Sequence, residues 1–104
     1  MNGKDFEKIF SIRVDMCKAT LLRKSAEYSS ESDKLHNFKV AAALQGCTPE
    51  RALGGFLAKH VVSIFDLINS ETPTPQEVWD EKLGDALNYL FLLDAIVQEE
   101  HLAE

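Results

Sequence analysis

The stretch EKLGDALNYLFLLDAIVQ, Glu81 to Gln98, decides the fold, because its apolar residues have the spacing of a helix that packs on more than one side. They recur at steps of three and four, which is the periodicity of an α-helix. One set, extended by the preceding turn, forms a seam suited to antiparallel packing: Trp79, Leu83, Ala86, Leu90, Leu93 and Val97. A second apolar flank is formed by Tyr89, Leu92 and Ile96. We therefore expect this helix to be central, covered by its own chain on one side and by another subunit on the other.

Two further helices are expected in the first half of the chain. The first should run from about Lys4 to Ser29, since one helical stripe of this segment is apolar. Its members are Phe6, Phe10, Cys17, Leu21 and Tyr28. The second, shorter helix fits LHNFKVAAALQG and should be closed by Gly46, because glycine adopts a left-handed cap at least cost.

The two later helices have explicit start signals. In CTPE, Thr48 is the expected N-cap and Pro49 the first helical residue, and the helix should stop before NSETPTP. Its expected core face is Leu53, Leu57, Val61, Ile64 and Ile68. In TPQE, Thr74 should cap the last helix, with Pro75 first and Glu77 completing a capping box. No strand pattern competes, so the expected fold is an all-α, four-helix-type bundle with three long helices and one short one, completed by oligomerisation.

Length and composition indicate the class of protein. A chain of 104 residues predicts a single domain over 1–104. The charged start and the lack of about 18 uninterrupted apolar residues predict neither a signal peptide nor a membrane span, and hence a cytoplasmic protein. Cys17 and Cys47 lack a CxxC spacing, which favours buried free thiols over a disulfide or zinc site.

The net charge of -6 is unevenly distributed along the chain. Residues 1–65 contain ten Lys/Arg and seven Asp/Glu, a balance of +3, whereas residues 66–104 contain ten acidic residues and only Lys82, a balance of -9. An acidic chain without interleaved aromatic and basic residues is a poor nucleic-acid binder, because phosphate neutralisation dominates that affinity. A basic half beside an acidic half suits a polyphosphate bridged to carboxylates by a divalent cation. An ordinary solvated acidic surface is the alternative interpretation.

The last helix contains a candidate cation site. Glu81, Asp85 and Asn88 lie on one line of this helix, because steps of four and three place side chains one above another. Two carboxylates beside an amide oxygen suit a hard cation that takes further oxygens from another helix or from water. The alternative is an exposed Glu81 with an Asp85 that accepts a buried hydrogen bond.

The earlier helices offer further candidates. In KHVVSIFD, Lys59 could contact a phosphate and Asp66 could complete a metal shell, while His60 borders the apolar face. The alternatives are a solvated polar face and a packed, hydrogen-bonded histidine. In RKSAEY, Lys24 and Glu27 lie on the margin of the apolar seam, close enough to point inward. No Gly-rich phosphate loop, nucleophile elbow, HExxH or CxxC cluster is present.

Five segments together resemble a known family: KSAEY, DKLHNFKVAA, TPERAL, KHVVSIFD and EKLGDALNYLFLL. They are similar to small phage-type proteins of the all-α nucleoside triphosphate pyrophosphohydrolase (MazG-like) superfamily, especially phage members associated with nucleotide modification. The resemblance spans about Lys24 to Leu93. The last helix looks like the superfamily's magnesium-binding E-E-x-x-D helix, with Asp85 matching its final carboxylate. Two positions depart from the pattern, since Lys82 stands where Glu is usual and the preceding helix lacks the partner E-x-x-E motif.

The resemblance implies subunits that pair, as a homodimer or homotetramer, around sites for Mg²⁺, or Mn²⁺, and a nucleoside triphosphate. The metal ligands would be drawn from Asp85, Glu81, Asp66 and Glu27, and the first three form the expected catalytic set. The expected substrate contacts are Lys59, Lys24, Asn88, Asn37 and His60. Two alternatives stay open. One is a relative that binds a nucleotide without hydrolysing it; the other is a non-enzymatic helical homo-oligomer, such as a phage accessory protein, whose polar residues fix the pairing register.

Overall fold

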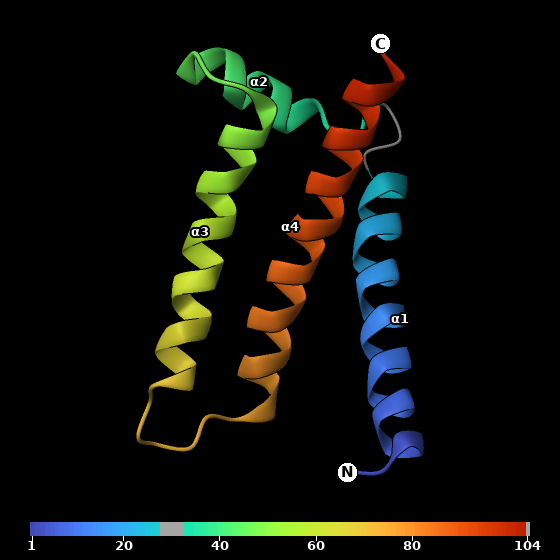
Figure 1. Ribbon diagram of the computed structural model, residues 1–104, viewed down its shortest axis with the longest axis vertical. Coiled ribbons are helices and arrows are strands. Elements are labelled where there is room, and N and C mark those ends of the chain that lie inside the picture. The colour runs from blue at the N-terminus through green and yellow to red at the C-terminus, as the bar shows by residue number, and fades with distance from the viewer. Residues whose placement is uncertain (28–32, 104) are drawn as a thin grey trace. The chain divides into compact units, whose positions relative to one another are not determined.

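The computed structural model describes the backbone of residues 1–27 and 33–103, and the side chains of residues 1–22 and 33–103. These residues form four helices and no strand (Figure 1), so the all-α class expected from the sequence is confirmed. None of the described helices combines the length and apolar character that crossing a bilayer requires. The chain divides into two compact units, residues 1–32 and 33–104, while the single domain expected over 1–104 stays a prediction.

The first unit contains α1, Gly3–Glu27. The helix begins within one residue of the predicted start, because Oδ1 of Asn2 accepts a hydrogen bond of 2.8 Å from the backbone N–H of Asp5. The rings of Phe6 and Phe10 stack with centroids 6.5 Å apart and are more than half exposed. Cys17 on the same stripe is buried and has a free thiol, as predicted.

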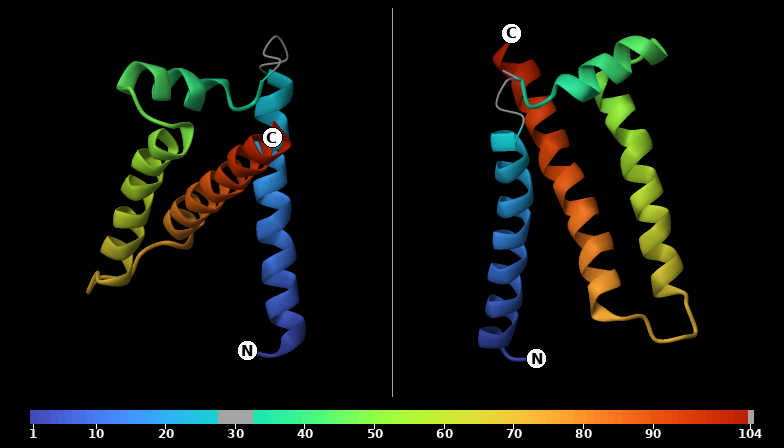
Figure 2. Two further views of the ribbon diagram at one scale, coloured as in Figure 1. Left: turned by 45° about the horizontal axis from the view of Figure 1, so that its top comes forward. Right: turned by 180° about the vertical axis from the view of Figure 1, so that it is seen from behind.

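The second unit contains α2 (His36–Gln45), α3 (Pro49–Ile68) and α4 (Gln76–Leu102). Helices α3 and α4 form an antiparallel hairpin, and α2 lies across the end where α3 begins and α4 ends (Figures 1 and 2). The short α2 thereby closes one end of the hairpin. Its packing brings residues from three helices into one core.

Three of the predicted helix ends are confirmed, including the stop of α3 at Ile68 before NSETPTP, and one is wrong. Gly46 closes α2 in the left-handed conformation, with φ 65° and ψ 39°, and Oγ1 of Thr48 accepts the N–H of Arg51 at 3.3 Å at the start of α3. Helix α4, however, begins at Gln76 without a side-chain cap. Pro75 has an extended backbone, with φ -58° and ψ 146°, so it precedes the helix instead of opening it. Thr74 is therefore one residue too far away to act as the N-cap.

The core of the second unit consists of Leu35, Phe38, Leu53 and Ile96, with Leu57, Tyr89, Leu92 and Leu93 packed against them. Leu53 is completely buried, and removing such a side chain from water stabilises a fold by about 1.5–3 kcal/mol. On α4, the second apolar flank packs into this core together with Leu93 of the predicted seam. Ala86 of that seam is also buried, whereas Leu83 and Leu90 of the seam are exposed. On α3, Val61 and Ile68 are exposed although both were expected in the core. Part of the expected core face of α3 and part of the expected seam of α4 are therefore exposed.

Candidate functional site

A histidine and a carboxylate meet across the hairpin. Nδ1 of His60 on α3 lies 3.8 Å from Oδ2 of Asp85 on α4. This distance is too long for a hydrogen bond, so the contact is electrostatic and depends on protonation of the imidazole. The side chains are 21% and 42% exposed, respectively, which leaves Asp85 open to a second partner.

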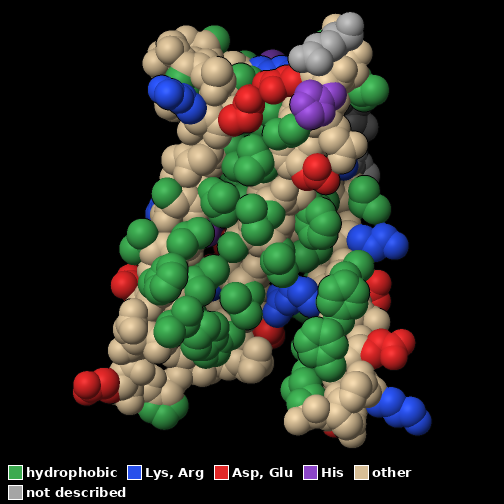
Figure 3. Space-filling model, in the orientation of Figure 1, with side chains coloured by type: hydrophobic (Ala, Val, Ile, Leu, Met, Phe, Trp, Pro, Cys, Tyr) green, Lys and Arg blue, Asp and Glu red, His purple; other side chains and the backbone are tan. Residues whose placement is uncertain are grey.

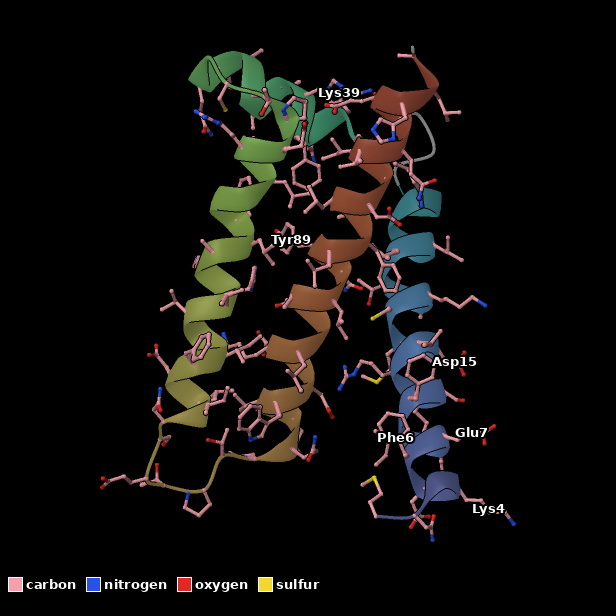
Figure 4. All side chains as sticks on the ribbon, viewed as in Figure 1. Lys4, Phe6, Glu7, Asp15, Lys39 and Tyr89 are labelled. Atoms are coloured by element: carbon pink, nitrogen blue, oxygen red, sulfur yellow. The ribbon has the colours of Figure 1, made fainter. Side chains whose placement is uncertain are left out.

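Tyr89 packs against a face of the imidazole ring of His60. Its ring stacks on His60 with centroids 5.0 Å apart and 29° between the planes, and it lies parallel to Phe56 at 6.2 Å. Phe38 of α2 meets both Tyr89 and Phe56 edge-on. Figure 4 shows Tyr89 between α3 and α4. Aromatic pairs of this kind are worth about 0.5–1.5 kcal/mol each beyond their buried area, so this cluster fixes the orientation of His60.

Helical spacing explains why these residues meet. Phe56 and His60 are four residues apart on α3, as are Asp85 and Tyr89 on α4, and residues at this spacing lie one above the other on a helix. Two such pairs on facing antiparallel helices form one four-residue contact. The sequence alone did not single out Phe56 or Tyr89 as site residues. The four-residue spacing of each pair was the sequence signal that could have identified them.

Helical periodicity also places most of the predicted site residues on one side of the hairpin. Successive residues of a helix are rotated by about 100°, so each helix has one side that faces its neighbour and a flank on either side of that contact. In an antiparallel pair, the flanks that lie on the same side of the contact together form one surface. We call this side the polar flank and define it by Lys59, Ser63 and Asp66 of α3 and Glu81, Asp85 and Asn88 of α4. Asp66 and Glu81 are exposed, as is Lys59, whose carbonyl accepts a hydrogen bond from Oγ of Ser63 at 3.2 Å.

Asn88 contains the least satisfied atom of the polar flank. Its Oδ1 is buried and has no hydrogen-bond partner in the described part of the chain. Leaving a buried acceptor unpaired costs about 1–3 kcal/mol, and a water molecule or an ion is a common explanation. Asn88 follows Asp85 by three residues, so the two side chains lie one turn apart. The amide oxygen is therefore an unsatisfied acceptor one turn from the carboxylate.

The donor atoms of the polar flank fit Mg²⁺ in part. Magnesium is usually held by one or two carboxylates together with water and substrate phosphates, and Asp85 and Glu81 supply two carboxylates one turn apart. The residues that the structure describes contain no cluster of three or more His, Cys, Asp or Glu side chains able to hold a metal ion. The flank thus suits a cation that arrives with a polyphosphate better than a metal held by protein alone.

Other predicted residues lie elsewhere. Asn37 is exposed in the first turn of α2, next to Phe38 of the aromatic cluster. Lys24 and Glu27 belong to the last turns of α1, and their side chains are outside the described residues.

Asp33 belongs to a separate ion-pair network and not to the polar flank. Nζ of Lys39, labelled in Figure 4, lies 2.5 Å from Oδ2 of Asp33 and 2.5 Å from Oε1 of Glu99. These two ion pairs join the start of α2 to the end of α4. The hydrogen bond from Lys39 lowers the pKa of Asp33, and a hydrogen bond from the N–H of Leu35 adds to this effect. Glu99 lies fourteen residues beyond Asp85, about 21 Å along α4. Asp33 and Asp85 therefore do not converge on one site.

Comparisons of the chain with protein-family models, with curated proteins and with solved structures find no match. Function is therefore inferred from the His60–Asp85 contact, the aromatic cluster around Tyr89 and the polar flank.

Proposed function

We propose that the chain binds a nucleoside triphosphate together with Mg²⁺, or Mn²⁺, on the polar flank, as a cytoplasmic MazG-like pyrophosphohydrolase or a nucleotide-binding relative. Hydrolysis would yield a nucleoside monophosphate and pyrophosphate. The observation that carries the proposal is the buried, unpartnered Oδ1 of Asn88, one turn from Asp85. The resemblance of this helix to a magnesium-binding helix supports the same assignment.

The polar residues divide into cation and phosphate contacts. Oxygens of Asp85, Glu81 and Asn88 would hold the cation, with Asp66 as a further ligand. A bound divalent cation neutralises phosphate oxygens and lowers the pKa of a water molecule. The ammonium group of Lys59, exposed on the same flank, would pair with a phosphate.

The aromatic cluster would receive the nucleobase. Phe56 is 46% exposed, and its ring is already held parallel to Tyr89, so its orientation is fixed before a ligand binds. Stacking of a base on an aromatic side chain is worth about 1–3 kcal/mol. Asn37 or Asn88 would orient the base or a water molecule. His60, whose Nδ1 lies 3.8 Å from Oδ2 of Asp85, would contact the substrate beside this cluster.

Thermal melting with and without Mg²⁺ or Mn²⁺ and a panel of nucleoside triphosphates tests binding. A ligand at 100 times its dissociation constant stabilises the folded state by about 2.7 kcal/mol, which a melting curve resolves. The same panel, assayed for pyrophosphate release, separates a hydrolase from a binding protein. Melting curves that stay unchanged with every cation and nucleotide pair would exclude the proposal.

The second candidate function is a non-enzymatic homo-oligomer, for example a phage accessory protein. The exposure of Leu83, Leu90 and Phe91 on α4 favours it, because large apolar side chains that gather on a protein surface mark interaction sites. In this proposal, the helix from Val78 to Val97 lies at the interface of a homodimer or homotetramer. Sedimentation at micromolar concentration tests it, and a well-folded monomer would count against it.

A further inference from the structure

The outer face of α3 presents an apolar stripe to solvent. Val62 and Phe65 are 59% and 56% exposed, and Val61 and Ile68 beside them are also exposed. Apolar side chains gather over α3 and α4 on the face shown in Figure 3. Large contiguous apolar patches on a protein surface mark interaction sites.

Side-chain size changes along this stripe. Its first half contains Gly54, Gly55 and Ala58, and its second half contains Val62 and Phe65 with the residues beside them. Glycine in a helix interior costs about 0.5–1 kcal/mol relative to alanine. A Cβ atom added to Gly54 or Gly55 would meet nothing within 4 Å, so no contact among the described residues requires these glycines.

We propose that a second copy of this chain packs its α3 antiparallel against this stripe around a two-fold axis. Such an interface is self-complementary, since each copy presents the same patch to the other. Antiparallel packing places the large half of one helix over the small half of the other. Phe65 of one copy then lies over Gly55 of the second copy, and Val62 lies opposite Ala58.

Charge is complementary in the same arrangement. Arg51 is exposed near the small end of the stripe and Asp66 is exposed near its large end. The antiparallel register brings Arg51 of each copy toward Asp66 of the other, which forms two opposite-charge pairs by symmetry. A parallel arrangement would instead place like charges together, at a cost to association.

Charge also argues against a lipid surface as the occupant. Helix α3 contains two acidic and two basic residues and α4 contains seven acidic residues and one lysine, whereas membrane-surface helices need an excess of basic residues to bind anionic lipids. A second copy fits both the size gradient and the charges. This inference does not depend on the proposed nucleotide site, because association needs neither cation nor substrate.

Sedimentation equilibrium of the wild type and of Gly55→Leu tests the interface. The added side chain should fill the space that the second copy's Phe65 occupies and raise the dimer dissociation constant by at least about tenfold, equivalent to about 1.4 kcal/mol. Leucine is a better helix former than glycine, so helicity by circular dichroism should be retained. Ala43→Leu, at an exposed position of α2, is the matched control and should leave the dissociation constant unchanged.

Charge reversal tests the antiparallel register. Arg51→Glu and Asp66→Arg should each weaken the dimer, and the double variant should recover most of the loss. A wild type that stays monomeric would overturn the proposal. So would a dimer that is insensitive to Gly55→Leu but dissociated by Leu90→Glu, because that result would place the interface on α4.

Discussion

His60 and Asp85 face each other across the α3–α4 hairpin, with Nδ1 of His60 3.8 Å from Oδ2 of Asp85. The same carboxylate is the one that the proposed function assigns to a divalent cation. Asp85 therefore has two candidate partners, the imidazole and a divalent cation. Its partial exposure allows either to be tested by substitution.

Asp85→Asn should remove stabilisation by Mg²⁺ and nucleotide while changing the stability of the free protein by less than about 1 kcal/mol. The small change is expected because partly exposed ion pairs contribute about 0–1 kcal/mol. The loss of cation response is expected because one of two neighbouring carboxylates is gone. Melting curves at neutral pH, with and without Mg²⁺, measure both effects.

Asp94→Asn is the matched control for Asp85→Asn. Asp94 is an exposed carboxylate on the same helix, and it accepts a hydrogen bond of 3.0 Å from Nε2 of Gln98. The control should keep the full Mg²⁺ response. A loss of about 3–5 kcal/mol in Asp85→Asn, with a wild type indifferent to Mg²⁺, would instead identify a structural ion pair.

The helices were predictable because their ends depend on local chemistry. Gly46 and Thr48 act through their own backbone and side-chain hydrogen bonds, so their positions can be found from neighbouring residues alone. The buried side of α4 was not predictable. Periodicity identifies two apolar flanks of α4, but the position of the neighbouring helices decides that Ile96 is buried and Leu90 is exposed.

The candidate site was predictable by residue type but not by contact. His60 and Asp85 were chosen because imidazole and carboxylate groups carry chemistry. Their pairing depends on the register of two helices, which a helical wheel of either helix does not contain. Tyr89 was missed as a site residue because an aromatic ring at an apolar position is typical of a core residue.

Tyr89→Ala should destabilise the second unit by an amount near the lower end of the about 3–5 kcal/mol typical of aromatic-to-alanine changes. Tyr89 is only partly buried, but its ring contacts three other rings, those of Phe38, Phe56 and His60. Urea unfolding measures the change. Tyr89→Phe keeps the ring and should stay within about 1 kcal/mol of the wild type, since the hydroxyl makes no part of the stacking. Equal losses in both variants would show that the hydroxyl, not the stacking, matters.

Leu53→Ala and Leu44→Ala make the same chemical change at opposite extremes of burial. Leu53 is 0% exposed and Leu44 is 83% exposed. The first should cost about 2–5 kcal/mol, because a buried cavity adds to the lost transfer energy. The second should be neutral within about 0.5 kcal/mol, as for other surface substitutions. Chemical denaturation of both variants gives the comparison, and similar costs would contradict the observed packing of α2 and α3.

Lys39→Met should raise the pKa of Asp33 toward its ordinary value of 3.8, because the hydrogen bond from Lys39 is the largest cause of the lowered pKa. Carboxylate NMR titration measures this shift.

The lowered pKa of Asp33 also makes stability depend on pH. A lowered carboxyl pKa contributes stability that is present above pH 3.8 and lost as the pH falls through the lowered value. The pKa of Lys39 is raised above 10.5, chiefly by Asp33 and then by Glu99, so its contribution is present below that pH and lost above it. The melting temperatures of wild type and variant should therefore differ at neutral pH and converge in strong acid. Lys18→Met, an exposed lysine of α1, should leave the Asp33 titration unchanged, and a gap that persists in strong acid would assign the effect of Lys39 to packing of its alkyl chain.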